Sequence, residues 1–136
     1  MKPAVIYFSR TGNTKRLAEA IAGELKAPIF AMSETQSSAL LDFDLLAVGT
    51  PVEGSSPAKE ASAFIASMPK TEGKKAVVFC TNRIFGSGRT MNKVEKMLEA
   101  KGYETILKVS KRGMQPSKET DFSDILAQVK TTLEKP

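Results

Sequence analysis

Residues 4–14, Ala-Val-Ile-Tyr-Phe-Ser-Arg-Thr-Gly-Asn-Thr, constrain the fold of this chain more than any other stretch. Their first half is apolar, β-branched or aromatic, and predicts a strand that is buried on both faces. A short loop with three hydroxyls and one glycine follows, and then a helical pattern with an apolar side chain at every fourth position from Leu17 to Leu25. We expect Thr11 or Asn13 to cap that helix. Because a helix N-terminus offers unpaired N–H groups and a favourable dipole, the stretch predicts a phosphate site.

Strand and helix patterns alternate along the rest of the chain. The predicted strands are residues 5–8, 29–32, 45–49, 76–80 and 103–109. Amphipathic helical patterns follow most of these strands, and such alternation produces a parallel sheet joined by right-handed crossovers. We therefore predict a single α/β domain over residues 1–136, a doubly wound five-stranded parallel sheet with helices on both faces.

Composition excludes several classes of function. The chain has 20 Lys and Arg against 15 Asp and Glu, but the basic residues are spread out and do not alternate with aromatics, so we expect no nucleic-acid partner. It lacks both a signal-peptide pattern and an apolar run of about 18 residues, so we expect a cytoplasmic protein without a membrane partner. One cysteine, Cys80, fits a reducing compartment. The absence of histidine excludes a His-based triad and a His-ligated metal.

Three polar loops follow the first, third and fourth predicted strands. They span residues 9–14, 50–56 and 81–88, and each is rich in turn-forming or hydroxyl residues. Since the carboxyl ends of parallel strands lie at one edge of a sheet, we expect the three loops to meet there. In doubly wound sheets this edge is where ligands bind.

The first loop, Ser9-Arg10-Thr11-Gly12-Asn13-Thr14, resembles the FMN phosphate loop of flavodoxins, Ser/Thr-x-Thr-Gly-x-Thr. Residues 44–52 are similar to the third strand and first flavin loop of that family. The size and order of elements over nearly the whole chain resemble a short-chain flavodoxin. The resemblance implies the strand order 2-1-3-4-5 and non-covalently bound FMN.

The resemblance also implies which residues hold the cofactor. The phosphate would be held by Ser9, Arg10, Thr11, Gly12, Asn13 and Thr14. One side of the isoalloxazine would face Thr50, Pro51, Val52, Glu53 and Gly54, and the other would face Thr81, Asn82, Arg83, Phe85 and Gly86. Gly54 would allow the Glu53–Gly54 peptide to flip towards the flavin N5.

Two features depart from the family pattern. The chain has no Trp, and Val52 and Glu53 stand where an aromatic is common, which leaves Phe85 as the side chain able to stack on the ring. The chain is also basic, with Arg10, Arg83 and Arg89 in or next to the loops, whereas flavodoxins are typically acidic. We expect this positive charge to make the second reduction step of a bound flavin less negative.

These observations predict an FMN-binding electron-transfer protein without catalytic residues of its own, because no general acid or base is evident. Its basic surface suggests acidic redox partners, and we expect a monomer or weak dimer. Two alternatives stay open: an FMN-dependent reductase of the NAD(P)H/quinone type, and a flavodoxin-like binding module that has lost flavin.

Overall fold

A computed structural model describes residues 1–115 and 118–134 of the chain. The strands are β1 Pro3–Tyr7, β2 Ile29–Ala31, β3 Leu45–Glu53, β4 Ser56–Pro57, β5 Lys74–Asn82 and β6 Tyr103–Arg112. The helices are α1 Asn13–Leu25, α2 Lys59–Ser67, α3 Ser87–Glu99 and α4 Ser123–Glu134. Two short 3₁₀ turns, Met32–Glu34 and Ser37–Asp42, connect β2 to β3.

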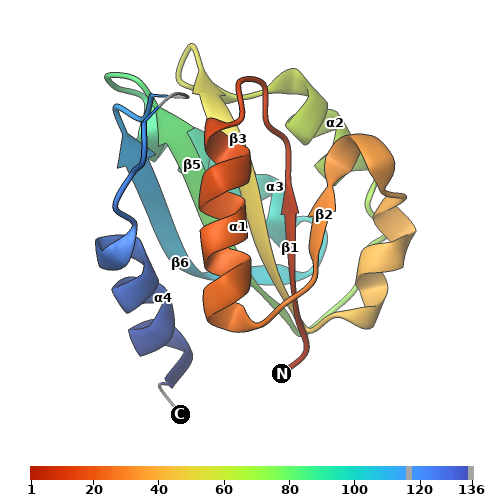
Figure 1. Cartoon of the computed structure of the whole chain (residues 1–136). Coiled ribbons are helices and arrows are strands. Elements are labelled where there is room, and N and C mark those ends of the chain that lie inside the picture. The colour runs from red at the N-terminus through yellow and green to blue at the C-terminus, as the bar shows by residue number, and fades with distance from the viewer. Residues whose placement is uncertain (116–117, 135–136) are drawn as a thin grey trace.

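Five parallel strands form the sheet in the order β2-β1-β3-β5-β6 (Figure 1). Counted without the two-residue β4, this is the predicted order 2-1-3-4-5, so the predicted doubly wound fold is confirmed. β4 pairs antiparallel with the end of β3 and lies off the main path of the sheet.

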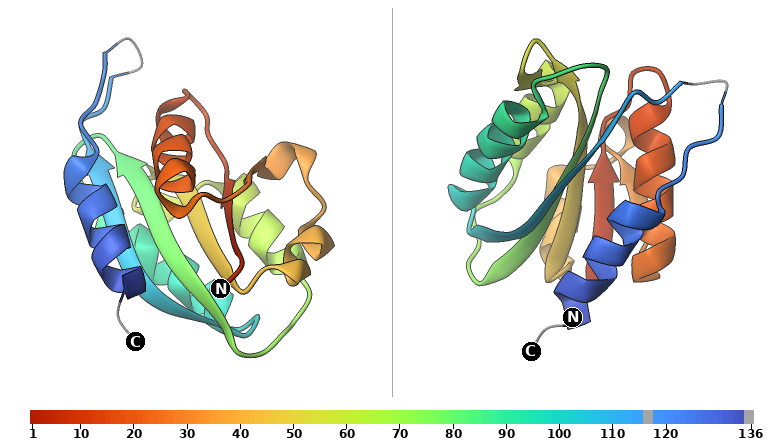
Figure 2. Two further views of the ribbon diagram at one scale, coloured as in Figure 1. Left: turned by 60° about the horizontal axis from the view of Figure 1, so that its bottom comes forward. Right: turned by 90° about the vertical axis from the view of Figure 1, so that its left-hand side faces the viewer.

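Helices cover both faces of the sheet, α1 and α4 on one and α2 and α3 on the other (Figures 1 and 2). Successive residues of each strand serve opposite faces, as the pleat requires. Val5 is buried with Leu17 of α1, whereas the next residue, Ile6, is buried with Ile65 of α2. The central strands are therefore apolar throughout, and each face is closed by its own hydrophobic cluster.

The predicted loop after β3 is wrong in part, because β3 does not end at residue 49. Its ladder with β5 continues to the pair Pro51–Thr81, and Val52 and Glu53 then pair with β4. Turn-forming residues predicted an irregular loop here, but the neighbouring strand and a tight hairpin keep the backbone extended.

The helices are amphipathic, and each buries one side against the sheet. α1 and α3, the longest in the described ranges, have 13 residues each. None of the helices in residues 1–115 and 118–134 has the length and apolar character that crossing a bilayer requires.

Candidate functional site

The three predicted loops meet at the carboxyl ends of β1, β3 and β5, at the top of Figure 1. Thr14 Oγ1 lies 2.7 Å from Thr81 Oγ1, which joins the first loop to the third. Arg10 hydrogen-bonds Glu53, which joins the first loop to the second. Gly86 packs so closely on the second loop that a Cβ there would lie 3.0 Å from the Ser55 Cα. Each loop thus contacts the other two.

The first loop turns into α1 through Gly12, which has φ +97° and is the N-cap of the helix. The Ser9 hydroxyl accepts hydrogen bonds from the N–H groups of Gly12 and Lys15, at 3.1 and 3.2 Å. The predicted cap by Thr11 or Asn13 is wrong, because the left-handed turn at Gly12 brings the Ser9 side chain to the helix N-terminus instead.

The N–H groups of Thr11, Asn13 and Thr14 have no acceptor among the described residues. They lie in one turn at the positive end of α1, the arrangement that binds anions. A hollow of about 300 Å³ adjoins the loop between the ends of β1 and β2, with Ser9, Gly12 and Glu34 in its lining. The loop is therefore open to a ligand.

The side chains of Thr14 and Asn13 are already engaged. Thr14 is 1% exposed and its hydroxyl pairs with Thr81. Asn13 Nδ2 donates to the Met114 carbonyl at 3.3 Å, and Asn13 Oδ1 accepts from Arg16 at 2.9 Å. Thr11 is exposed, so its hydroxyl is the accessible one of these three side chains.

The second loop is a tight hairpin between β3 and β4. Gly54 and Ser55 both have positive φ, 59° and 63°, as in the two-residue turns that match the twist of paired strands. At its base, the Thr50 hydroxyl accepts from the Ala58 N–H and donates to the Pro51 carbonyl, both at 3.0 Å. Thr50 is buried, and its hydroxyl supports the chain just before α2.

Arg10 forms a cluster with two carboxylates, one on the hairpin and one on α2. Its guanidinium donates to Glu53 at 2.9 Å and to Glu60 at 3.0 and 3.1 Å, and it lies 5.0 Å from the centre of the Phe8 ring. Hydrogen bonds from Arg10 lower the pKa of Glu60, and the two carboxylates raise the pKa of Arg10 further above its ordinary value. Arg10 was expected to be one of three arginines that add positive charge to the cofactor loops, and the structure shows its charge paired with two carboxylates.

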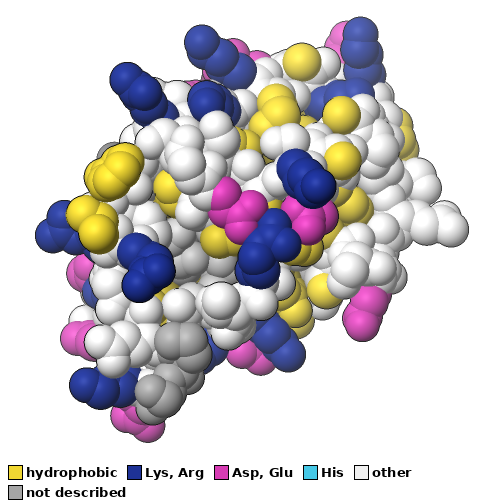
Figure 3. Space-filling model, turned by 90° about the horizontal axis from the view of Figure 1, so that it is seen from above, with side chains coloured by type: hydrophobic (Ala, Val, Ile, Leu, Met, Phe, Trp, Pro, Cys, Tyr) yellow, Lys and Arg dark blue, Asp and Glu magenta, His cyan; other side chains and the backbone are white. Residues whose placement is uncertain are grey.

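The third loop carries the exposed apolar side chains of the site. Ile84 and Phe85 are 71% and 73% exposed, and Arg83 beside them is exposed too. Asn82 Oδ1 is buried and has no partner in the described structure. Figure 3 looks onto this end of the molecule, where hydrophobic side chains protrude among basic ones at the margin.

Cys80, at the end of β5, takes no part in the chemistry of this edge. It is fully buried, and burial raises the pKa of its thiol to about 12. The thiolate, which is the reactive form, is therefore not populated near neutral pH.

A fourth segment reaches the same edge, and the sequence prediction missed it. After β6, the carbonyls of Met114 and Gln115 accept from Asn13 and Arg16 of α1. The signal was present, since β6 is the fifth parallel strand and its carboxyl end must lie beside the others. Glu60 was also missed, and no pattern in the sequence links it to Arg10.

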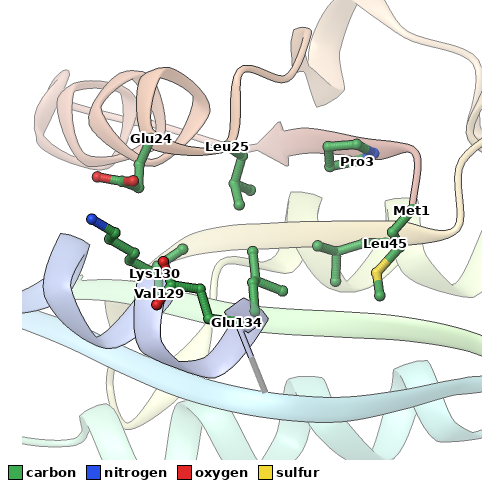
Figure 4. Close-up of a pocket in the computed structure, with 9 residues that line it drawn as sticks. Met1, Pro3, Glu24, Leu25, Leu45, Val129, Lys130 and Glu134 are labelled. Atoms are coloured by element: carbon green, nitrogen blue, oxygen red, sulfur yellow. The ribbon is translucent and has the colours of Figure 1, made fainter. Parts of the chain in front are cut away.

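A second cavity, of about 290 Å³, lies at the opposite end of the sheet (Figure 4). Leu25, Leu45 and Val129 contribute apolar lining, and Glu24 and Lys130 lie at its margin (Figure 4). It is lined by none of the predicted site residues, and it is separate from the loop cluster.

Comparison with known proteins agrees with this architecture. A family model described as a flavodoxin domain matches residues 4–131. An uncharacterized protein of Methanocaldococcus jannaschii is 28% identical over 108 residues, which are 78% of this chain and 71% of that protein. Oxidised flavodoxin 1 from Bacillus cereus has the same fold, with a TM-score of 0.84 at 20% identity over 100% of this chain and 99% of its own. Two-electron reduced Megasphaera elsdenii flavodoxin gives a TM-score of 0.78 at 23% identity, with 96% of each chain covered. Since the family model spans nearly all of the sequence, the chain belongs to the flavodoxin-domain family.

Proposed function

We propose that this chain binds FMN non-covalently at the loop cluster and transfers electrons between protein partners. The observation that carries the proposal is the set of N–H groups of Thr11, Asn13 and Thr14, which have no acceptor among the described residues. A phosphate at this helix N-terminus would accept from these donors and interact favourably with the helix dipole.

The residues around the phosphate position fit such a group. Gly12 has no heavy atom within 4 Å of the place where a Cβ would stand, so a phosphate can approach the backbone closely. The exposed Thr11 hydroxyl offers a further donor. Ser9 would support the turn by holding the N–H groups of Gly12 and Lys15.

The hairpin and the third loop would hold the ring. Val52 supplies an apolar wall, Ile84 and Phe85 supply exposed apolar surface, and Asn82 Oδ1 is a buried acceptor without a partner. Remaining contacts would come from Pro51, Glu53, Gly54, Thr81, Arg83 and Gly86. Few aromatics are present, so we expect the phosphate to contribute most of the affinity.

Bound FMN supplies one- and two-electron redox chemistry, and the protein fixes and orients it. At this edge, Cys80 is buried with a raised pKa, and Glu60 is ion-paired with a lowered pKa. This favours a carrier over an enzyme with its own substrate. The exposed residues Arg83, Ile84 and Phe85 suit transient docking of an acidic partner.

Titration of the purified protein with FMN and with riboflavin, followed by quenching of flavin fluorescence, tests the proposal. Riboflavin lacks only the phosphate. Two or more charge-assisted hydrogen bonds are worth about 3 kcal/mol or more, so FMN should bind about 100-fold more tightly. Equal affinities, or no quenching by FMN, would refute the phosphate anchor.

The carrier role is tested separately on the FMN-loaded protein. NADH and NADPH should not be consumed by the protein alone, and steady turnover would favour the reductase alternative. After photoreduction, the rate of electron transfer to anionic ferricyanide should fall with added salt and in the R83E variant. An electron-transfer rate that rises with added salt would contradict the proposed attraction between the basic surface and an anionic partner.

A further inference from the structure

We infer that Arg10, although it lies within the phosphate loop, is a positioning residue that fixes the hairpin to that loop and is not a phosphate ligand. This inference rests on the proposed function and deepens it. It starts from the number of N–H groups that the guanidinium has left. Arginine has five, and Arg10 uses Nε, Nη1 and Nη2 in four hydrogen bonds to Glu53 and Glu60. One N–H remains for any other acceptor.

Electrostatics disfavours a phosphate beside this guanidinium. The hydrogen bonds from Arg10 lower the pKa of Glu60, so the Glu60 carboxylate is ionised at neutral pH. Glu53 contributes a second carboxylate to the same guanidinium. The three side chains together then carry one net negative charge. A phosphate dianion placed on Arg10 would lie next to two carboxylates, which repel it. The backbone N–H groups at the start of α1 carry no such penalty.

The three charged residues belong to three different elements. Arg10 is in the loop between β1 and α1, Glu53 is the last residue of β3, and Glu60 is in the first turn of α2. The guanidinium also lies over the Phe8 ring, with its carbon 5.0 Å from the ring centre, within the range of a cation–π contact. We call this set, Arg10, Glu53, Glu60 and Phe8, the arginine clasp.

The arginine clasp acts on the part of the hairpin that would face the flavin. Glu53 and Ser56 are the last pair of the hairpin before its two-residue turn, so fixing the Glu53 side chain fixes the start of the turn. On its other side the hairpin contacts Gly86 of the third loop. The arginine clasp therefore determines the distance between the first and second loops. A flavin whose phosphate lies at the first loop and whose ring lies at the second would occupy the space between them.

Two measurements test the inference with R10Q, E53Q/E60Q and the control K59Q. Lys59 is an exposed cation beside Glu60 for which no ion pair is found among the described residues, so K59Q removes the same charge and breaks none of the hydrogen bonds of the arginine clasp. The first measurement is amide hydrogen exchange of the hairpin in flavin-free protein. We expect exchange at residues 52–56 to be faster by about threefold or more in R10Q and in E53Q/E60Q, and unchanged in K59Q.

The second measurement is the ratio of riboflavin to FMN dissociation constants, which isolates the contribution of the phosphate. We expect this ratio to stay within about threefold in R10Q and to stay equal or rise in E53Q/E60Q. A direct Arg10–phosphate contact predicts instead a fall of about tenfold or more in R10Q.

Unchanged hairpin exchange in both clasp variants, or a tenfold fall of the ratio in R10Q, would overturn the inference. If R10Q does not fold, E53Q/E60Q decides by the same two measurements. If the unaltered protein binds neither flavin, the proposed function fails, and the exchange measurement alone decides whether the arginine clasp positions the hairpin.

Discussion

Replacement of Thr14 by valine should destabilise the protein more than its small change in shape suggests. The Thr14 and Thr81 hydroxyls lie 2.7 Å apart, and the two residues are 1% and 6% exposed, so neither hydroxyl can turn to water. In T14V the Thr81 hydroxyl stays buried without a partner, which costs about 1–3 kcal/mol. T81V should cost a similar amount. T14V/T81V removes both polar groups. Its loss in free energy of unfolding should therefore be smaller than the sum of the two single losses, by about 1–3 kcal/mol.

Urea unfolding of flavin-free protein measures these differences. With an m-value of about 2 kcal/mol/M, each single variant should lower the midpoint by about 0.5–1.5 M. T11V is the matched control, since Thr11 is in the same loop but exposed, and its change should stay within about 0.5 kcal/mol. Single variants as stable as the unaltered protein, or a double variant whose loss equals the sum of both, would refute the assignment of a coupled buried pair.

Two further predictions concern glycine and cysteine. Gly102 has φ +96°, and a Cβ there would lie 1.8 Å from the Thr71 carbonyl oxygen, so G102A should lower the free energy of unfolding by more than about 3 kcal/mol. Gly73 has φ +72° with no atom within 4 Å, so G73A should cost only backbone strain of about 1 kcal/mol; equal losses in urea melts would contradict the clash. Burial raises the pKa of Cys80 from 9.0 to about 12, so above pH 9 the unfolded chain releases a proton that the folded chain keeps, and this contribution to stability falls by up to about 1.4 kcal/mol per pH unit as pH rises. C80A should lack that component. Between pH 8 and pH 10.5 the free energy of unfolding should therefore fall more in the unaltered protein than in C80A. An equal fall in both proteins would show that the pKa of the thiol is not raised by folding.

The sequence predicted the fold well because its signals are local and repeated. Apolar strands and amphipathic helices in alternation predict a parallel sheet covered on both faces, and the convergence of the loops follows from the strand ends. The strand order itself was implied by the resemblance to flavodoxins, because right-handed crossovers alone allow more than one order. The extension of β3 to Glu53 was not predictable in this way. Residues from Thr50 onward have turn-forming character, and only pairing with β4 and β5 makes them a strand.

The sequence predicted where the candidate site lies, at the carboxyl ends of the strands, but not which side chains contact one another there. Ser9 replaced the predicted helix caps because the turn at Gly12 is left-handed, a geometry that the sequence permits but does not require. The pairing of Arg10 with Glu60 joins residues 50 positions apart on separate elements. No sequence periodicity indicates a contact between residues so far apart. The positive charge of Arg10 was therefore predictable from the sequence, but its pairing with carboxylates was not.

The compensation of Arg10 changes where the excess positive charge of this protein can act. A phosphate at the first loop would depend on N–H dipoles, because the arginine of that loop, Arg10, is paired with two carboxylates. Arg83, on the third loop, is exposed beside Ile84 and Phe85, and no ion pair of it is found in residues 1–115 and 118–134. An exposed charge is screened within about 8 Å at physiological ionic strength, so it influences a partner at the surface more than a group held deeper between the loops. The basic character of the chain should therefore alter the encounter with partners more than the potential of a bound flavin, and the salt dependence of electron transfer is the property in which it should be visible.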